Sequence, residues 1–89
     1  MNSLDYKLSD IEKKDLISCC IIKGSNTRRL YEISPLPYGY MFCFKDNQGY
    51  SNSFVVNIMD KCKIIDVLPK CDFTEKLEYF LTEYFKKHK

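Results

Sequence analysis

The chain has 89 residues, with 14 basic and 12 acidic side chains and a formal net charge of +2. This length has room for one small domain, and a hydrophobic content of 45% excludes a disordered protein. Dedicated nucleic-acid binders usually carry a larger and more clustered basic excess. We therefore expect residues 1–89 to form a single small globular domain, with residues 1–7 as a loose N-terminal lead.

The opening run MNSLDYKLSDIEKKD is polar and charged, which predicts no signal peptide. No stretch approaches the ~18 apolar residues of a membrane span. Five cysteines, two of them adjacent at Cys19 and Cys20, make a poor disulfide framework and favour reduced thiols. We expect a cytoplasmic protein with no membrane partner. Residues encoded by A/T-rich codons are abundant and Ala is absent, which favours a low-GC genome or a mobile element such as a phage.

The first predicted helix lies in LSDIEKKDLISCCIIKG, residues 8–24. Ser9 and Glu12 have the spacing of a capping box, and Lys23 followed by Gly24 is a plausible end. The apolar residues of the second half encircle the helix axis and form no stripe. The pattern therefore leaves residues 16–23 open between helix and strand.

Four β-branched and aromatic runs follow, each bounded by turn residues: 27–34 (TRRLYEIS), 38–45 (YGYMFCFK), 53–59 (SFVVNIM) and 63–68 (KIIDVL). Pro35 and Pro37 cannot donate to a ladder, so the sequence predicts a three-residue loop at 35–37. The run KDNQG contains Gly49, which can adopt positive φ, and predicts a hairpin loop. Short connections of this kind predict a four-stranded antiparallel meander.

One face of that sheet is predicted to be the core. A hairpin with Phe42 opposite Phe54, followed by a turn at Asp60–Lys61, brings uncharged residues to the same side. In this register Ile65 lies opposite Val56, and Val67 lies opposite Phe54. The predicted core face is Tyr38, Tyr40, Phe42, Phe44, Phe54, Val56, Ile58, Ile65 and Val67.

The last segment, CDFTEKLEYFLTEYFKKHK, predicts a C-terminal amphipathic helix. Asp72 is the expected cap, with Glu75 three residues later. The apolar side chains fall at helical spacing on one stripe: Phe73, Leu77, Phe80, Leu81 and Tyr84. The predicted fold is therefore α+β, with an N-terminal helix, a four-stranded antiparallel meander and the C-terminal helix packed on one sheet face.

The opposite face of the predicted sheet mixes apolar and polar side chains: Arg29, Tyr31, Ile33, Met41, Cys43, Val55, Asn57, Met59, Ile64 and Asp66. A half-apolar face of this kind suits a partner-binding surface, although the first helix could cover part of it. The loop KDNQGYSN adds further contact residues, and Tyr and Arg dominate interface hot spots. The predicted partner-binding residues are Arg29, Tyr31, Met41, Tyr50, Asn52 and Asn57.

Other chemistries lack the residues they need. The sole histidine, His88, is near the C-terminus and no cysteine pair has CxxC spacing, so we predict no metal site, no cofactor and no catalytic residue. The run YGYMFCFK fits the aromatic signature of RNA-recognition motifs poorly, because Tyr38 occupies the place of a basic residue. The alternative function is a small nucleic-acid-binding or regulatory protein that uses basic and aromatic surface residues, with single-strand binding as its specific form.

These observations favour a non-enzymatic protein-binding module. Small cytoplasmic proteins of this profile are often antagonists, such as immunity proteins, antitoxins or phage inhibitors. The expected partner is a toxin, a nuclease or a host defence component. Self-association into a homodimer, through the half-apolar face or an edge strand, is the next alternative.

Overall fold

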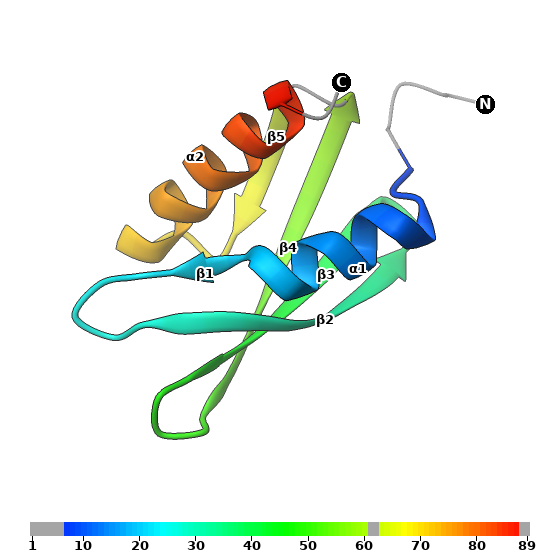
Figure 1. The fold of residues 1–89 in the computed structure, drawn as a ribbon. Coiled ribbons are helices and arrows are strands. Elements are labelled where there is room, and N and C mark those ends of the chain that lie inside the picture. The colour runs from blue at the N-terminus through cyan, green and yellow to red at the C-terminus, as the bar shows by residue number, and fades with distance from the viewer. Residues whose placement is uncertain (1–6, 61–62, 88–89) are drawn as a thin grey trace.

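The structure, a computed structural model, describes residues 7–60 and 63–87 and places two helices and five strands in them (Figure 1). The strands form one antiparallel sheet in chain order that curls into a half-barrel. The elements are α1 (Asp10–Cys19), β1 (Ile21–Ile22), β2 (Arg28–Leu36), β3 (Gly39–Asp46), β4 (Ser51–Asp60), β5 (Lys63–Leu68) and α2 (Asp72–Lys87). The predicted α+β class and meander are confirmed, but the strands number five, not four. Neither described helix is long and apolar enough to cross a membrane.

The additional strand comes from the segment that the sequence left open. The capping box is present: the Ser9 hydroxyl accepts the Glu12 amide at 3.1 Å, and the Glu12 carboxylate accepts the Ser9 amide at 2.9 Å. The helix ends at Cys19, well before the predicted end at Lys23–Gly24. Residues 21–22 then pair with β2, because two adjacent β-branched isoleucines fit a strand better than a helix end.

The connection between β2 and β3 is tighter than predicted. β2 continues through Pro35, which pairs with Tyr40, so the turn is formed by residues 37–38 and the predicted loop at 35–37 is wrong. Tyr38 lies in this turn and is 60% exposed, which removes it from the predicted core face. Gly39 follows directly, and a Cβ there would lie 2.6 Å from the carbonyl oxygen of Val56, closer than real side chains approach.

A β-bulge at Tyr31 changes which side chains of β2 face the core. Leu30 pairs with Phe44 and Ile33 pairs with Phe42, and all four side chains are buried. Ile33 is therefore in the core, although the sequence placed it on the opposite face. An extra residue in one strand reverses the alternation beyond it, which strict period-2 counting cannot anticipate.

The register of the central hairpin is confirmed, and that of the last is wrong by two residues. Phe42 lies opposite Phe54, as predicted, but Val56 pairs with Val67 because the β4–β5 ladder is irregular between Asn57 and Asp60. A shift of two keeps each side chain on its face, although Ile64 packs against the core from its irregular position. The side chain of Ile65 and the predicted turn residue Lys61 fall outside what the structure describes.

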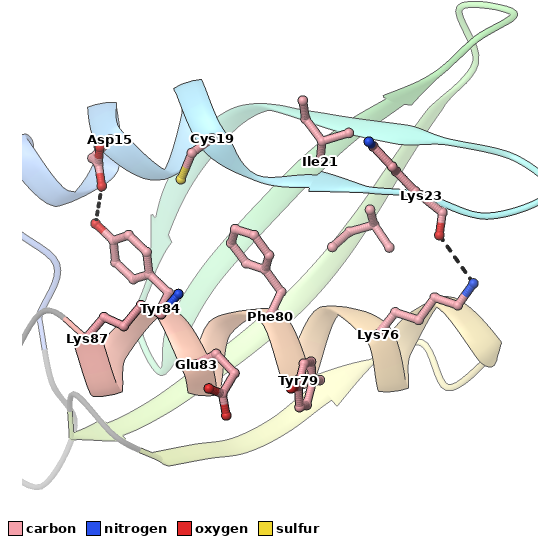
Figure 2. A pocket seen from close by; sticks show the side chains of 11 residues that line it. Asp15, Cys19, Ile21, Lys23, Lys76, Tyr79, Phe80, Glu83, Tyr84 and Lys87 are labelled. Carbon is pink, nitrogen blue, oxygen red and sulfur yellow. Dashed lines mark hydrogen bonds between the residues drawn. The ribbon is translucent and has the colours of Figure 1, made fainter.

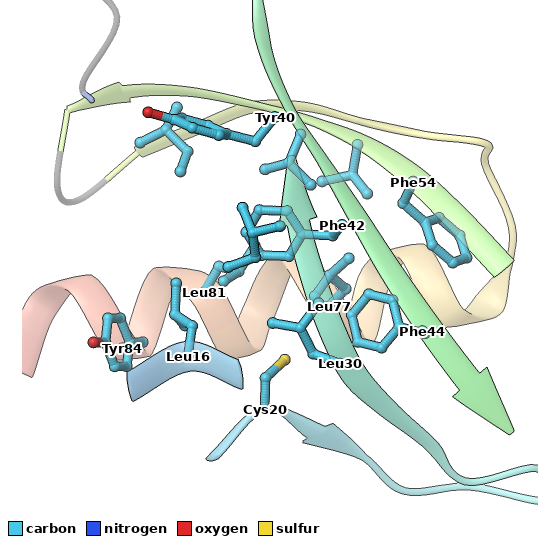
Figure 3. Packing of buried hydrophobic residues seen from close by; sticks show 14 of the residues in the cluster. Leu16, Cys20, Leu30, Tyr40, Phe42, Phe44, Phe54, Leu77, Leu81 and Tyr84 are labelled. Carbon is cyan, nitrogen blue, oxygen red and sulfur yellow. The ribbon is translucent and has the colours of Figure 1, made fainter. Parts of the chain in front are cut away.

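Both helices lie on the same face of the sheet, which we call the covered face (Figures 1 and 3). α1 therefore does not cover the opposite face, the option that the sequence left open. α2 begins at Asp72 itself, and the Thr74 hydroxyl in its first turn accepts the Cys71 amide at 3.0 Å. The buried core is Leu8, Leu16, Cys20, Ile22, Leu30, Ile33, Tyr40, Phe42, Phe44, Phe54, Val56, Ile58, Val67, Phe73, Leu77, Leu81, Tyr84 and Phe85.

The aromatic residues of β3 belong to this core. Phe42 and Phe44 are 0% exposed, and the Phe44 ring meets the rings of Phe54 and Phe73 edge to face, with centroids 5.8 and 5.0 Å apart. The Tyr40 hydroxyl accepts a hydrogen bond from the Leu8 amide at 2.8 Å. These rings hold the domain together and offer no free face on which a nucleotide base could stack.

Candidate functional site

No described helix packs on the face of the sheet that lies opposite the covered face. Strand pairing brings an apolar row to its centre, in which Met41 lies opposite Val55 and Val55 opposite Leu68. Met41 and Val55 are half-buried and Leu68 is 43% exposed. We call this surface the open face; its residues are Arg29, Tyr31, Glu32, Ser34, Met41, Cys43, Lys45, Ser53, Val55, Asn57, Asp66 and Leu68.

Polar side chains surround the apolar row. The Lys45 ammonium lies 4.8 Å from the centre of the Tyr31 ring, a cation–π contact, and Arg29 pairs with Lys45 across the strands. These three residues form a positively charged corner with an aromatic ring that is 40% exposed. At the other side of the face, Asp66 forms an ion pair with Lys70 at 3.0 Å.

The structure brings four of the six predicted partner-binding residues to the open face: Arg29, Tyr31, Met41 and Asn57. The amide oxygen of Asn57 is buried against Gly39 and has no hydrogen-bond partner among the described residues, so this side chain serves the tight β2–β3 turn. Asn52 pairs with Phe44, which places it on the covered face of the sheet. Tyr50 is 68% exposed beside the β3–β4 turn, and the next residue, Ser51, accepts a hydrogen bond from the Tyr31 hydroxyl at 3.4 Å.

A second surface, which the sequence did not predict, lies on the covered side. A groove with a volume of about 570 Å³ runs between α1–β1 on one side and α2 on the other (Figure 2). Phe80 projects from α2 into it and is only half-buried, whereas the sequence predicted it as part of the core stripe. We call it the interhelical groove; its apolar lining is Cys19, Ile21, Ile22, Tyr79, Phe80 and Tyr84.

Two hydrogen bonds join the walls of the interhelical groove, one toward each end (Figure 2). The Tyr84 hydroxyl donates to the Asp15 carboxylate at 2.7 Å, and the Lys76 ammonium donates to the Lys23 carbonyl at 3.3 Å. Burial, together with the nearby Asp15 carboxylate, raises the pKa of Tyr84 above its ordinary value. The phenol therefore remains a hydrogen-bond donor at neutral pH.

The described thiols differ in their surroundings at the two helices. Burial, and then the Asp15 carboxylate, raise the pKa of Cys19 at the end of α1. The Thr74 hydroxyl, and then the backbone amides of α2, lower the pKa of Cys71 just before α2.

In residues 7–60 and 63–87, no three His, Cys, Asp or Glu side chains gather as metal ligands. Comparison of the chain with known protein families, characterised proteins and solved structures gives no match.

Proposed function

We propose that the chain is a protein-binding module that docks a partner protein on the open face. The observation that carries this proposal is the apolar row of Met41, Val55 and Leu68, which no described helix covers. Arg29 and Tyr31 lie farther along the same face, beyond the Glu32–Cys43 pair. An apolar centre within a polar rim is the usual anatomy of a protein interface. Met, Tyr and Arg are the residue types enriched there.

The charge of the open face indicates how a partner would be oriented. Arg29 and Lys45 lie together at one corner, and the Asp66–Lys70 pair lies across the apolar row. A partner with an acidic patch next to an apolar one would match this corner, and such complementarity chiefly sets the encounter rate and the register. The small size, the composition and this surface favour an antagonist, such as an immunity protein, an antitoxin or a phage inhibitor.

Co-purification of the tagged protein from its source cells tests the proposal. The wild type should retain one protein at a defined ratio. Tyr31→Ala and Arg29→Ala should each lose it, because truncation of a hot-spot residue costs about 2 kcal/mol of binding or more. Circular dichroism and a cooperative melt check that both variants remain folded.

Tyr79→Ala is the matched control, because Tyr79 is 69% exposed but lies on α2, on the other side of the molecule. It should keep the partner. If Tyr79→Ala lost the partner and Tyr31→Ala kept it, docking would lie on the covered side of the sheet, and the proposal would be contradicted. Binding of labelled oligonucleotides that weakens steeply with salt would favour the nucleic-acid alternative.

A further inference from the structure

The interhelical groove has a shape that favours a small ligand over a polypeptide. Lys76 and Tyr84 both lie on α2 and hold the two hydrogen bonds that join the walls. These positions are eight residues apart, so the bonds are separated by roughly 12 Å along the helix axis. A continuous chain lying along the groove would have to cross both bonds, whereas a short molecule fits between them.

The lining predicts an apolar body for such a ligand. Phe80 and Ile21 are half-buried and Tyr79 is exposed, so filling the groove would remove further apolar surface from water. The volume of about 570 Å³ lies within the range of small-molecule sites, which are mostly apolar with a few placed polar groups.

The charges at the rim predict an anionic head group. Three lysines line the groove, Lys23, Lys76 and Lys87, against two carboxylates, Asp15 and Glu83, so the lining has a net positive charge. Glu83 is also paired with the Lys86 ammonium at 3.7 Å. Lys76 and Lys87 supply positive charge toward the two ends of the α2 wall (Figure 2). Among the ion pairs of residues 7–60 and 63–87, none involves these two lysines.

From this arrangement we propose that the interhelical groove binds a short amphipathic carboxylate, with its apolar body against Phe80 and its carboxylate beside Lys76 or Lys87. This site lies on the covered side of the sheet and is independent of partner docking on the open face. Its ligand class follows from an apolar lining about 12 Å long with positive charge at its ends.

Titration of the full chain with octanoate, followed by amide chemical shifts in ¹⁵N spectra, tests the proposal. Saturable shifts should cluster at residues 19–23 and 76–87 and leave β3 and β4 unchanged. Octan-1-ol, which lacks the charge, and octyltrimethylammonium, which reverses it, should bind more weakly by about threefold or more.

Two variants and a matched control separate the charge from the apolar lining. K76Q/K87Q should weaken octanoate binding about threefold to tenfold, and K7Q/K14Q, which removes two exposed lysines outside the groove, should leave it unchanged. Cys19 is exposed at the end of α1 with its side chain toward the groove, so C19F should fill the space and abolish binding. The spectrum of each variant without ligand reports whether the fold is kept.

Three results would overturn the proposal. The first is the absence of saturable shifts at millimolar octanoate. The second is equal binding of octan-1-ol and octanoate, which would mean that the groove is only an apolar surface. The third is octanoate binding that persists in C19F or maps to the open face.

Discussion

The two helices lie side by side on the covered face but contribute to the fold in different ways. α2 has 16 residues, of which six are buried, whereas α1 has ten residues and buries only Leu16. Ile11 on α1 is 80% exposed. α2 therefore forms one wall of the core. α1 is a short helix that is stabilised by its capping box, one buried leucine and a hydrogen bond to α2. A helix that covers a sheet need not supply much of the core.

Phe85→Ala should be the most damaging change and should show how much of the stability depends on α2. Phe85 is 0% exposed and packs edge to face against Tyr84, with ring centroids 5.2 Å apart. Truncation of a buried Phe typically costs about 3–5 kcal/mol, a large part of the net stability of a small domain. Urea denaturation measures the loss; a change below about 1 kcal/mol would mean that α2 is not part of the core.

Leu16→Ala should cost less, about 2–4 kcal/mol, because Leu is smaller than Phe and its truncation leaves a smaller cavity. Ile17→Ala is the matched control on the same helix, since Ile17 is 36% exposed and should cost less than about 1 kcal/mol. The same denaturation experiment checks both. Equal losses in the two variants would contradict the conclusion that Leu16 is the side chain by which α1 is anchored in the core.

The sequence predicted the structure correctly where a feature depends only on residues close together in the chain. The stripe of α2 and the capping box of α1 each arise from contacts between residues three or four positions apart. The capping box is confirmed, and four of the five predicted stripe residues are buried, with Phe80 only partly buried against the core. The hairpin register of Phe42 with Phe54 follows from the loop that joins the two strands. By contrast, the β-bulge at Tyr31 is a feature of the backbone that the spacing of apolar residues does not reveal. The sheet face on which Ile33 lies was therefore predicted wrongly.

The candidate sites depend on contacts that are distant in sequence. Asp15 and Tyr84 meet across 69 positions, and local periodicity contains no information about such a pair. The interhelical groove was therefore missed, although the position of Phe80 at the margin of the α2 stripe was a weak signal for it. On the open face, alternation placed Arg29 and Met41 together. Asn52 was assigned to the loop KDNQGYSN, but β4 already begins at Ser51, so Asn52 lies two residues before Phe54 and on the same covered face.

Tyr84→Phe removes the hydrogen bond between the helices and should cost about 1–2 kcal/mol, because the Asp15 carboxylate loses a donor in a partly buried place. Its pH dependence gives a second test. The folded-state pKa of Tyr84 is raised above the ordinary value of 10.0, so the wild type should lose stability as pH rises above about 10. The variant should show less of that decline in denaturation curves at pH 9 and 11. An identical decline would show that Tyr84 does not titrate with unfolding.

The smallest effect on stability is expected at the thiols, where the helices differ in reactivity. Cys19 ends α1 near Asp15, and its pKa is raised by partial desolvation of the thiol against the protein and then by that carboxylate. Cys71 precedes α2, and its pKa is lowered by the Thr74 hydroxyl and then by backbone amides of the first turn. The thiolate is the nucleophile, so iodoacetamide at pH 7 should alkylate Cys71 several-fold faster than Cys19, with both cysteines exposed. Peptide mapping by mass spectrometry gives both rates in one sample. Thr74→Val should reduce the difference between the two alkylation rates. Equal rates in the wild type would mean that the surroundings of the two helix ends do not shift the pKa values of Cys19 and Cys71.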